Sequence, residues 1–155
     1  MAPEHPPFVP KPGQVDFTHA RFAPVINCVL EFQGTILIVQ RSAKLNFYPN
    51  YWNGVSGFLD DAKTIDEKVH EELREELAIR PDQIREIIRG QIFEQEEGQY
   101  AKTWIVHPVL VRVATDAVKL DWEAASHRWI TPAEATQYQL LPGFDRVLKN
   151  LRDFM

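Results

Sequence analysis

The stretch Gly57–Ile79, GFLDDAKTIDEKVHEELREELAI, joins a glycine-led acidic loop to the pattern of an amphipathic helix. Thr64 and Glu67 have the spacing of a capping box, in which each side chain bonds the backbone N–H of the other residue, so we expect the helix to begin after Thr64. Apolar residues then recur at every fourth position: Ile65, Val69, Leu73 and Leu77. This repeat predicts a helix that buries one side against the core of the protein.

Glutamates occupy a neighbouring side of the same helix. Glu72, Glu75 and Glu76 stand three and four residues apart, a spacing that brings side chains together on a helix surface. Like charges at that spacing repel, and a divalent cation that takes oxygen ligands would turn the repulsion into attraction. A solvated acidic face, partly neutralised by Lys68 and Arg74, is the alternative that the helix by itself leaves open.

The segment resembles the Nudix box, whose pattern is G-x5-E-x7-R-E-U-x-E-E-x-G-U, where U is an aliphatic residue. The matching positions are Gly57, Glu72, Leu73, Glu75, Glu76 and Ile79. Lys63 replaces the first glutamate of the pattern, Glu71 replaces the arginine, and Ala78 replaces the last glycine. Because Lys63 and Glu71 both reverse the charge, we hypothesise that an ion pair between loop and helix is inverted rather than lost. Loss of the arginine could instead leave Glu72 poorly oriented.

The resemblance to the Nudix hydrolase family covers roughly residues 22 to 151. It implies an α/β fold, namely an α/β/α sandwich around a mixed β-sheet, and a hydrolase that requires Mg²⁺ or Mn²⁺. The expected substrate is a nucleoside diphosphate linked to another group, as in a nucleoside triphosphate, a dinucleotide or a nucleotide sugar. By family likeness Glu72, Glu75 and Glu76 hold the metal, Glu72 and Glu75 take part in catalysis with Glu72 as general base, and Gly57 shapes the loop.

Further candidates lie outside the box. The resemblance makes Glu123 the first candidate for another metal ligand from a late acidic loop, in competition with Glu94, Glu96 and Glu97. Arg41 could bind a phosphate group, and Trp52 stands where the family often has an aromatic residue before the glycine loop. Other side chains that could bind phosphate or stack on a base are Lys44, Phe47, Tyr48, Tyr100 and Trp122. For each of these, a place in the core, an ion pair or a solvated position is the alternative.

The remaining chain divides into a tail and one domain. Residues 1–15 are rich in proline, which removes backbone donors, so we expect an extended tail or a segment laid over a domain formed by residues 16–155. Strands are predicted at 23–32 and 35–40, joined by a tight turn at Gln33-Gly34, and at 52–56. Residues 84–94 and 102–114 are expected to form a hairpin around Gly98, and Trp129-Ile130 a short strand. Helices are predicted to open at Thr131 and after Gly143.

Composition limits the classes of function. The 155 residues suffice for one domain with a real core, and the net charge of −5 argues against a general nucleic-acid surface, which needs clustered basic residues. No apolar stretch has the length of a membrane span and the N-terminus lacks the layout of a signal peptide, so a cytoplasmic location is the expectation. The single cysteine, Cys28, lies in an apolar run and is expected to be a buried structural thiol. A homodimer is plausible by family likeness alone.

Two other functions remain open at this stage. A domain that has lost parts of the box could bind a nucleotide or a protein and hydrolyse nothing. The pattern before the box also resembles isopentenyl-diphosphate isomerases, which share the fold. Those enzymes have a cysteine just before the box glycine and a histidine just after it, whereas this chain has Ser56 and Phe58, so isomerisation is disfavoured.

Overall fold

The computed structural model describes residues 8–155, so the first part of the predicted proline-rich tail lies outside the described residues. Strands of the chain form one mixed sheet of eight, in the order β3-β2-β1-β7-β5, with β4 paired to β1, β6 to β7 and β8 to β2. The strands are β1 (Phe22–Phe32), β2 (Thr35–Arg41), β3 (Trp52–Asn53), β4 (Val55–Phe58), β5 (Ile84–Arg89), β6 (Phe93–Glu97), β7 (Lys102–Val113) and β8 (Ala124–Ile130). The long strands β1 and β7 run parallel through the middle, and every other strand pair is antiparallel.

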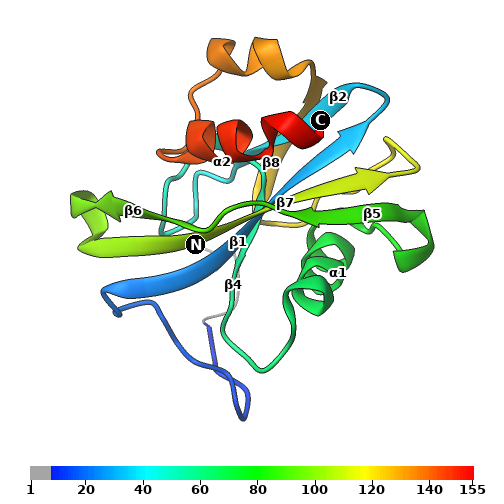
Figure 1. Cartoon of the computed structure of the whole chain (residues 1–155). Coiled ribbons are helices and arrows are strands. Elements are labelled where there is room, and N and C mark those ends of the chain that lie inside the picture. The colour runs from blue at the N-terminus through cyan, green and yellow to red at the C-terminus, as the bar shows by residue number, and fades with distance from the viewer. Residues whose placement is uncertain (1–7) are drawn as a thin grey trace.

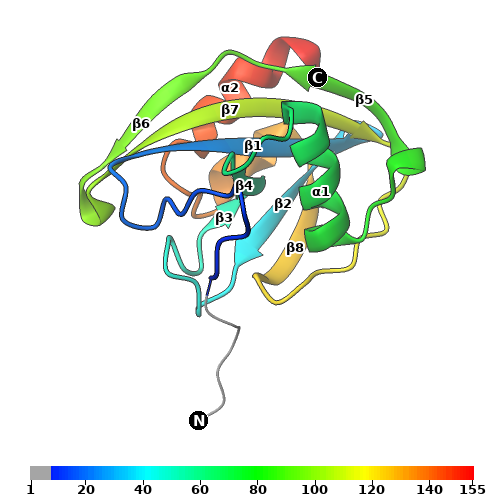
Figure 2. The ribbon, with the colours of Figure 1, turned by 90° about the horizontal axis from the view of Figure 1, so that it is seen from below.

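Two helices lie on opposite faces of this sheet (Figure 1). They are α1 (Ile65–Leu77) and α2 (Phe144–Leu151), and short 3₁₀ helices span Pro81–Gln83, Gly98–Tyr100, Pro132–Gln137 and Arg152–Phe154. Figure 2 shows α1 crossing the near face of the sheet while α2 lies beyond it. This arrangement confirms the predicted α/β fold with a mixed sheet between helices.

The alternation of side chains along β1 explains why the sheet has a core on each face. Ile26, Cys28 and Leu30 belong to the cluster that contains the apolar stripe of α1, whereas Ala23 and Val29 belong to the cluster that contains the buried side of α2. Successive residues of a strand point to opposite faces, so a continuous apolar run serves both layers. Cys28 is fully buried, as predicted.

The ends of α1 explain its position. Thr64 and Glu67 form the predicted capping box, and Ala78 closes the helix in the left-handed conformation at φ 58°. In that conformation the backbone N–H of Ala78 bonds to the carbonyls of Arg74 and Leu73, and Ile79 turns into the core, where it is fully buried. The box pattern has glycine at this position, which is the residue that adopts a positive φ without a side-chain clash.

Several boundaries differ from the sequence-based expectations. β8 begins at Ala124 rather than Trp129, because its polar half pairs with β2 although it lacks an apolar pattern. The expected strand 84–94 is interrupted near Gly90, whose N–H bonds to the carbonyl of Pro108. The helix expected from Thr131 is a single 3₁₀ segment. No helix among residues 8–155 is long and apolar enough to cross a membrane.

Candidate active site

Gly57 brings strand β4 into direct contact with Glu72 of α1. A Cβ atom at Gly57 would lie 2.5 Å from Cδ and 2.6 Å from Oε1 of Glu72, closer than real Cβ contacts allow. No side chain fits at position 57 while the Glu72 carboxylate keeps this position, so the box glycine allows Glu72 to lie against β4.

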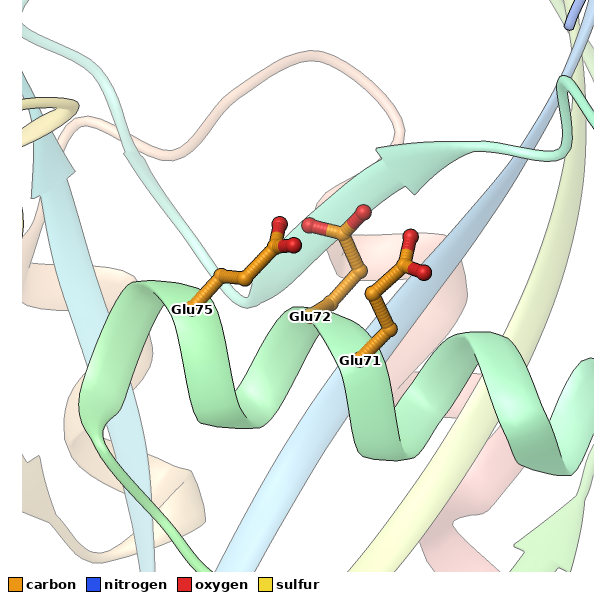
Figure 3. Close-up of side chains that lie close together, drawn as sticks. All are labelled: Glu71, Glu72 and Glu75. Atoms are coloured by element: carbon orange, nitrogen blue, oxygen red, sulfur yellow. The ribbon is translucent and has the colours of Figure 1, made fainter. Parts of the chain in front are cut away.

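Three carboxylates gather on the same side of α1. Oxygen atoms of Glu71, Glu72 and Glu75 lie within 4.8 Å of one another, and Figure 3 shows the three side chains leaving the helix on one side with their carboxyl groups side by side. Glu71 and Glu72 are half-buried and Glu75 is exposed. The structure therefore brings together the predicted Glu72 and Glu75, and adds Glu71, which stands where the box pattern has arginine.

Glu76 stands outside this group of three carboxylates but shares a hydrogen bond with Glu72. Its Oε2 atom is buried and has no hydrogen-bond partner among the described residues. Burial first, then a hydrogen bond with Glu72 and the charge of Glu123, raises the pKa of Glu76 well above its ordinary value. A buried carboxylate oxygen without a partner is costly unless a proton or a cation completes it.

Glu72 shares this environment. Burial, followed by the nearby charges of Glu123 and Glu75, raises its pKa to about 7, although the hydrogen bond with Glu76 opposes the rise. Glu123 therefore lies close enough to influence both Glu72 and Glu76 electrostatically, and its backbone is held by the N–H of Ser42 at 2.8 Å. This proximity is consistent with the predicted role of Glu123 beside the box glutamates.

The hypothesis of an inverted ion pair is confirmed as a contact. Nζ of Lys63, in the loop before α1, lies 2.9 Å from Oε2 of Glu71. Burial raises the pKa of Glu71, but hydrogen bonds from Lys63 and Lys68 outweigh it, so the pKa of Glu71 is lowered and the group stays ionised. The two substituted residues of the box thus form an ion pair with each other.

Lys68 forms a second connection between the loop and α1. Its side chain is only 2% exposed, and its Nζ contacts Oδ1 of Asp60 at 3.2 Å, Oδ2 of Asp61 at 2.9 Å and Oε1 of Glu71 at 3.0 Å. Burial lowers the pKa of Lys68, yet these three carboxylates raise it above its ordinary value. Lys68 is therefore an internal cation and does not neutralise a solvated face of the helix.

A cavity of about 970 Å³ adjoins Glu71, Glu72, Glu75 and Glu123, whereas Glu76 is not among its described lining residues. Its acidic lining residues are Asp16, Asp60, Asp61, Glu71, Glu72, Glu75 and Glu123, and its lysines and arginine are Lys11, Arg41, Lys63 and Lys68. Away from the carboxylates the walls are mainly aromatic and apolar, with contributions from Phe47, Tyr48, Phe58, Trp104, Val106 and Phe144. The cavity thus combines a carboxylate-rich end with a wall suited to a planar organic group.

The two predicted substrate-binding residues occupy different positions. Arg41 lines the cavity, but its Nε and Nη2 donate to the carbonyl of Phe47 at 3.0 and 2.9 Å. Burial lowers the pKa of Arg41, and the charge of Glu123 opposes that effect. Trp52 packs edge-on against Tyr138, with 5.1 Å between the ring centroids. It is not among the described residues that line the cavity. Contact of either residue with substrate stays a prediction.

Some of the other predicted substrate-binding residues line the cavity and some do not. Phe47, Tyr48 and Trp122 line the cavity, whereas Lys44 and Tyr100 are not among its described lining residues. Tyr100 supports the wall from behind, because its hydroxyl accepts a hydrogen bond from the N–H of Tyr48 at 2.8 Å. The competing glutamates, Glu94, Glu96 and Glu97, lie on β6 and do not line the cavity either.

Sequence reasoning missed the parts of the cavity that come from distant segments. Phe58 and Trp104 form part of the aromatic wall, and the N-terminal segment 8–19 contributes another side. Asn27 and Asn53 lie in the lining and bond each other, Nδ2 to Oδ1 at 2.9 Å. The one sequence feature that could have indicated this part of the cavity was the polar Asn27 inside an apolar strand.

The donor set fits a divalent cation of the hard type. Mg²⁺ and Mn²⁺ prefer carboxylate oxygens, which Glu72 and Glu75 present close together. The buried, unpartnered Oε2 of Glu76 is a further oxygen that a cation could satisfy. The residues present therefore fit the metal that the box resemblance implies.

Comparisons with known proteins agree with this geometry. The family model described as the NUDIX domain matches residues 20–151, whereas no curated protein matches the chain. Among solved structures, the chain is similar to the Escherichia coli ORF135 protein, with 23% identity, a TM-score of 0.66, and coverage of 86% of this chain and 91% of that chain. It is similar also to a NUDIX hydrolase from Nitrosomonas europaea, with 15% identity, a TM-score of 0.71 and coverage of 86% and 90%.

A third similar structure is the NUDIX domain of Shewanella oneidensis NrtR in complex with ADP ribose, with 17% identity, a TM-score of 0.68 and coverage of 87% and 88%. At these identities the solved structures establish a shared fold. Because the family model spans most of the chain and the altered box keeps its glutamates around Gly57, the protein belongs to the NUDIX domain family.

Proposed function

We propose that the protein is a hydrolase that depends on Mg²⁺ or Mn²⁺ and cleaves a nucleoside diphosphate linked to another group. The observation that carries the proposal is the arrangement of Glu72 against Gly57, beside Glu75 and the unpartnered Oε2 of Glu76. The complex of a similar NUDIX domain with ADP ribose is compatible with this class of substrate.

The glutamates divide the work by position. Glu75, Glu76 and Glu123 are the proposed metal ligands together with Glu72, and a bound Mg²⁺ or Mn²⁺ would supply positive charge to the diphosphate and the leaving oxygen. Glu72, which is fixed by Gly57, accepts the proton of the attacking water. The water oxygen forms a bond to phosphorus, the P–O bond to the leaving group breaks, and the leaving oxygen takes the bonding electron pair.

Glu71 has a different role in this proposal. Its oxygens bond Lys63 and Lys68, so we assign it to holding the loop against α1 rather than to the metal. A cytoplasmic location and a homodimer stay predictions.

The test is release of nucleotide and phosphate from nucleoside triphosphates, dinucleotides and nucleotide sugars, with Mg²⁺ or Mn²⁺. Wild type is compared with Glu76→Gln and with the control Glu94→Gln, which removes an exposed glutamate of β6 away from the cavity. We expect turnover by wild type and the control, and a loss of at least about a hundredfold in Glu76→Gln.

The alternative is a module that binds nucleotides without turnover. Absence of product from every substrate, with folded proteins that nucleotides still stabilise against heat, would favour this module over the hydrolase. The isomerase alternative gains nothing from the structure, because no cysteine is among the described residues that line the cavity.

A further inference from the structure

The cations of the cavity are largely committed to other groups. Lys63 contacts Asp61 and Glu71, and Lys68 contacts both of these and Asp60. Arg41 donates two hydrogen bonds to a backbone carbonyl. Lys11 is the cavity-lining lysine that forms no ion pair with another described residue. A phosphate group entering the cavity therefore meets few available positive charges besides any bound metal.

The shortage of available positive charge in the cavity favours some phosphate esters over others. A nucleoside triphosphate brings a third phosphate with a doubly ionisable end, whereas a diphosphate with an organic group on each phosphorus has one ionisable oxygen per phosphorus. The acidic lining outnumbers the basic lining, so each added negative charge meets repulsion that Lys11 by itself offsets only in part. The charge distribution favours the substrate with fewer charges.

The size and lining of the cavity also favour a diphosphate that has two organic groups. Its volume of about 970 Å³ is at the upper end of the range of ligand pockets, about 300–1,000 Å³. Phe47 and Phe58, which line the cavity and are only half-buried, offer aromatic surface to one organic group. Space and apolar surface remain for a second group on another side.

That other side is formed by the N-terminal segment 8–20, which we call the strap. It is fixed to the box loop, because the N–H of Val15 donates to the carbonyl of Asp60 at 2.6 Å and Nε2 of Gln14 donates to Oδ2 of Asp60 at 2.8 Å. It is fixed again where Nζ of Lys102 donates to the carbonyls of Phe17 and Ala20, at 2.6 and 2.5 Å. Figure 2 shows the strap in dark blue, passing beneath β1 toward the end where that strand begins.

The start of the strap carries apolar surface that the fold leaves open. Phe8 and Val9 line the cavity, yet they are 52% and 73% exposed. Lys11, two residues further on, lines it as well. An organic group that extends past the diphosphate would cover these apolar side chains, and their burial would contribute to binding.

We propose that the substrate is a diphosphate with organic groups on both phosphates, rather than a nucleoside triphosphate, and that the strap binds one of these groups through Phe8 and Val9. This inference rests on the proposed function and narrows its substrate class.

The first experiment compares pairs of substrates that share a nucleoside diphosphate and differ in the group attached to its second phosphate: ADP-ribose with ATP, UDP-glucose with UTP, and GDP-mannose with GTP. We call the member of each pair with an organic group on both phosphates the diester. In each pair that reacts, we expect kcat/KM to be at least about tenfold higher for the diester than for the triphosphate. Equal or higher kcat/KM for the triphosphates would overturn the inference and leave the proposed hydrolase intact.

Absence of turnover from all pairs, and from the dinucleotides of the first test, would instead overturn the proposed function. Calorimetric titration of the same pairs with Mg²⁺ then decides the inference separately, because tighter binding of the triphosphate contradicts it and tighter binding of the diester supports it.

The second experiment tests the strap with the double variant Phe8→Ala/Val9→Ala. Both side chains are exposed, so the fold is expected to persist, which circular dichroism checks. We expect KM, or Kd if no turnover occurs, to rise by about three- to tenfold for the diesters and to stay unchanged for the triphosphates. The matched control Phe154→Ala removes an exposed phenylalanine that does not line this cavity. Equal effects on both substrate classes, or no effect on either, would contradict the role of the strap.

Discussion

Gly57 matters for the position of one carboxylate rather than for the freedom of the backbone. In Gly57→Ala the new methyl group would overlap Cδ and Oε1 of Glu72, the far end of a flexible side chain that can move aside at small cost. We expect the free energy of unfolding to fall by about 1 kcal/mol or less, while kcat falls by at least about tenfold because the base is displaced.

The control for that variant is Gly98→Ala, whose methyl group would have no heavy atom within 4 Å. Steady-state kinetics and urea unfolding of both variants give the comparison. A Gly57→Ala protein with wild-type kcat would show that the placement of Glu72 does not limit the reaction.

Ala78 stands where the box pattern has glycine, and this departure has a consequence for stability. Its φ of 58° costs an L-residue about 1–2 kcal/mol, a strain that glycine would remove. Part of this stabilisation is offset because glycine makes the unfolded chain more flexible. Ala78→Gly is therefore expected to stabilise the protein by about 0.5–1 kcal/mol, measured by urea unfolding. A destabilised variant would mean that the methyl group makes a contact worth more than the strain.

At the scale of elements, the junction between the box loop and α1 depends on charges that the family pattern has in reverse. A double-mutant cycle with Lys63→Ala and Glu71→Ala measures the coupling directly. Lys63 is 43% exposed at its side chain and solvent screens the pair, so we expect a coupling energy of about 0.5–1 kcal/mol. Additive single effects would show that the contact contributes nothing to stability.

The glutamate side of α1 also predicts a dependence of stability on pH. The pKa of Glu72 is about 7 in the fold and has an ordinary value of 4.5, so the folded state binds more protons between these values. Without metal, the contribution of Glu72 to the free energy of unfolding is therefore greatest below pH 4.5, and it is lost as the pH rises through 7.

With EDTA present, we expect Tm to be a few degrees higher at pH 5.5 than at pH 7.5, and Mg²⁺ to reduce the difference because a bound cation favours the ionised carboxylates. The variant Glu72→Gln should weaken the pH dependence. Thermal unfolding followed by circular dichroism provides the data, and a Tm that rises with pH in EDTA would contradict the expectation.

For the whole molecule, local patterns predicted local structure well. The capping box and the four-residue apolar repeat predicted α1, and the box alignment placed Gly57 and Glu72 together. These features depend on residues close in the chain. The burial of Lys68 could not be read in this way, because spacing does not distinguish an internal lysine from a solvated one.

The walls of the cavity were beyond sequence reasoning for a related reason. Trp104 comes from β7, which the paired sheet brings near the box loop, and the strap reaches that loop through its hydrogen bonds to Asp60. β8 was predicted too short because its pairing with β2, rather than its own apolar pattern, makes it a strand.

The parallel pairing of β1 with β7 has a consequence for how the chain acquires its structure. Glu31 and Arg112, which bond across these strands, are separated by 81 residues, so the first strand waits for a late partner. Closing so long a loop is entropically unfavourable and slow. During synthesis the apolar β1 must leave the ribosome well before β7 exists. Even after β2 and β4 have paired with β1, the nascent chain spends that interval with the β7 edge of its central strand unpaired and open to chaperones.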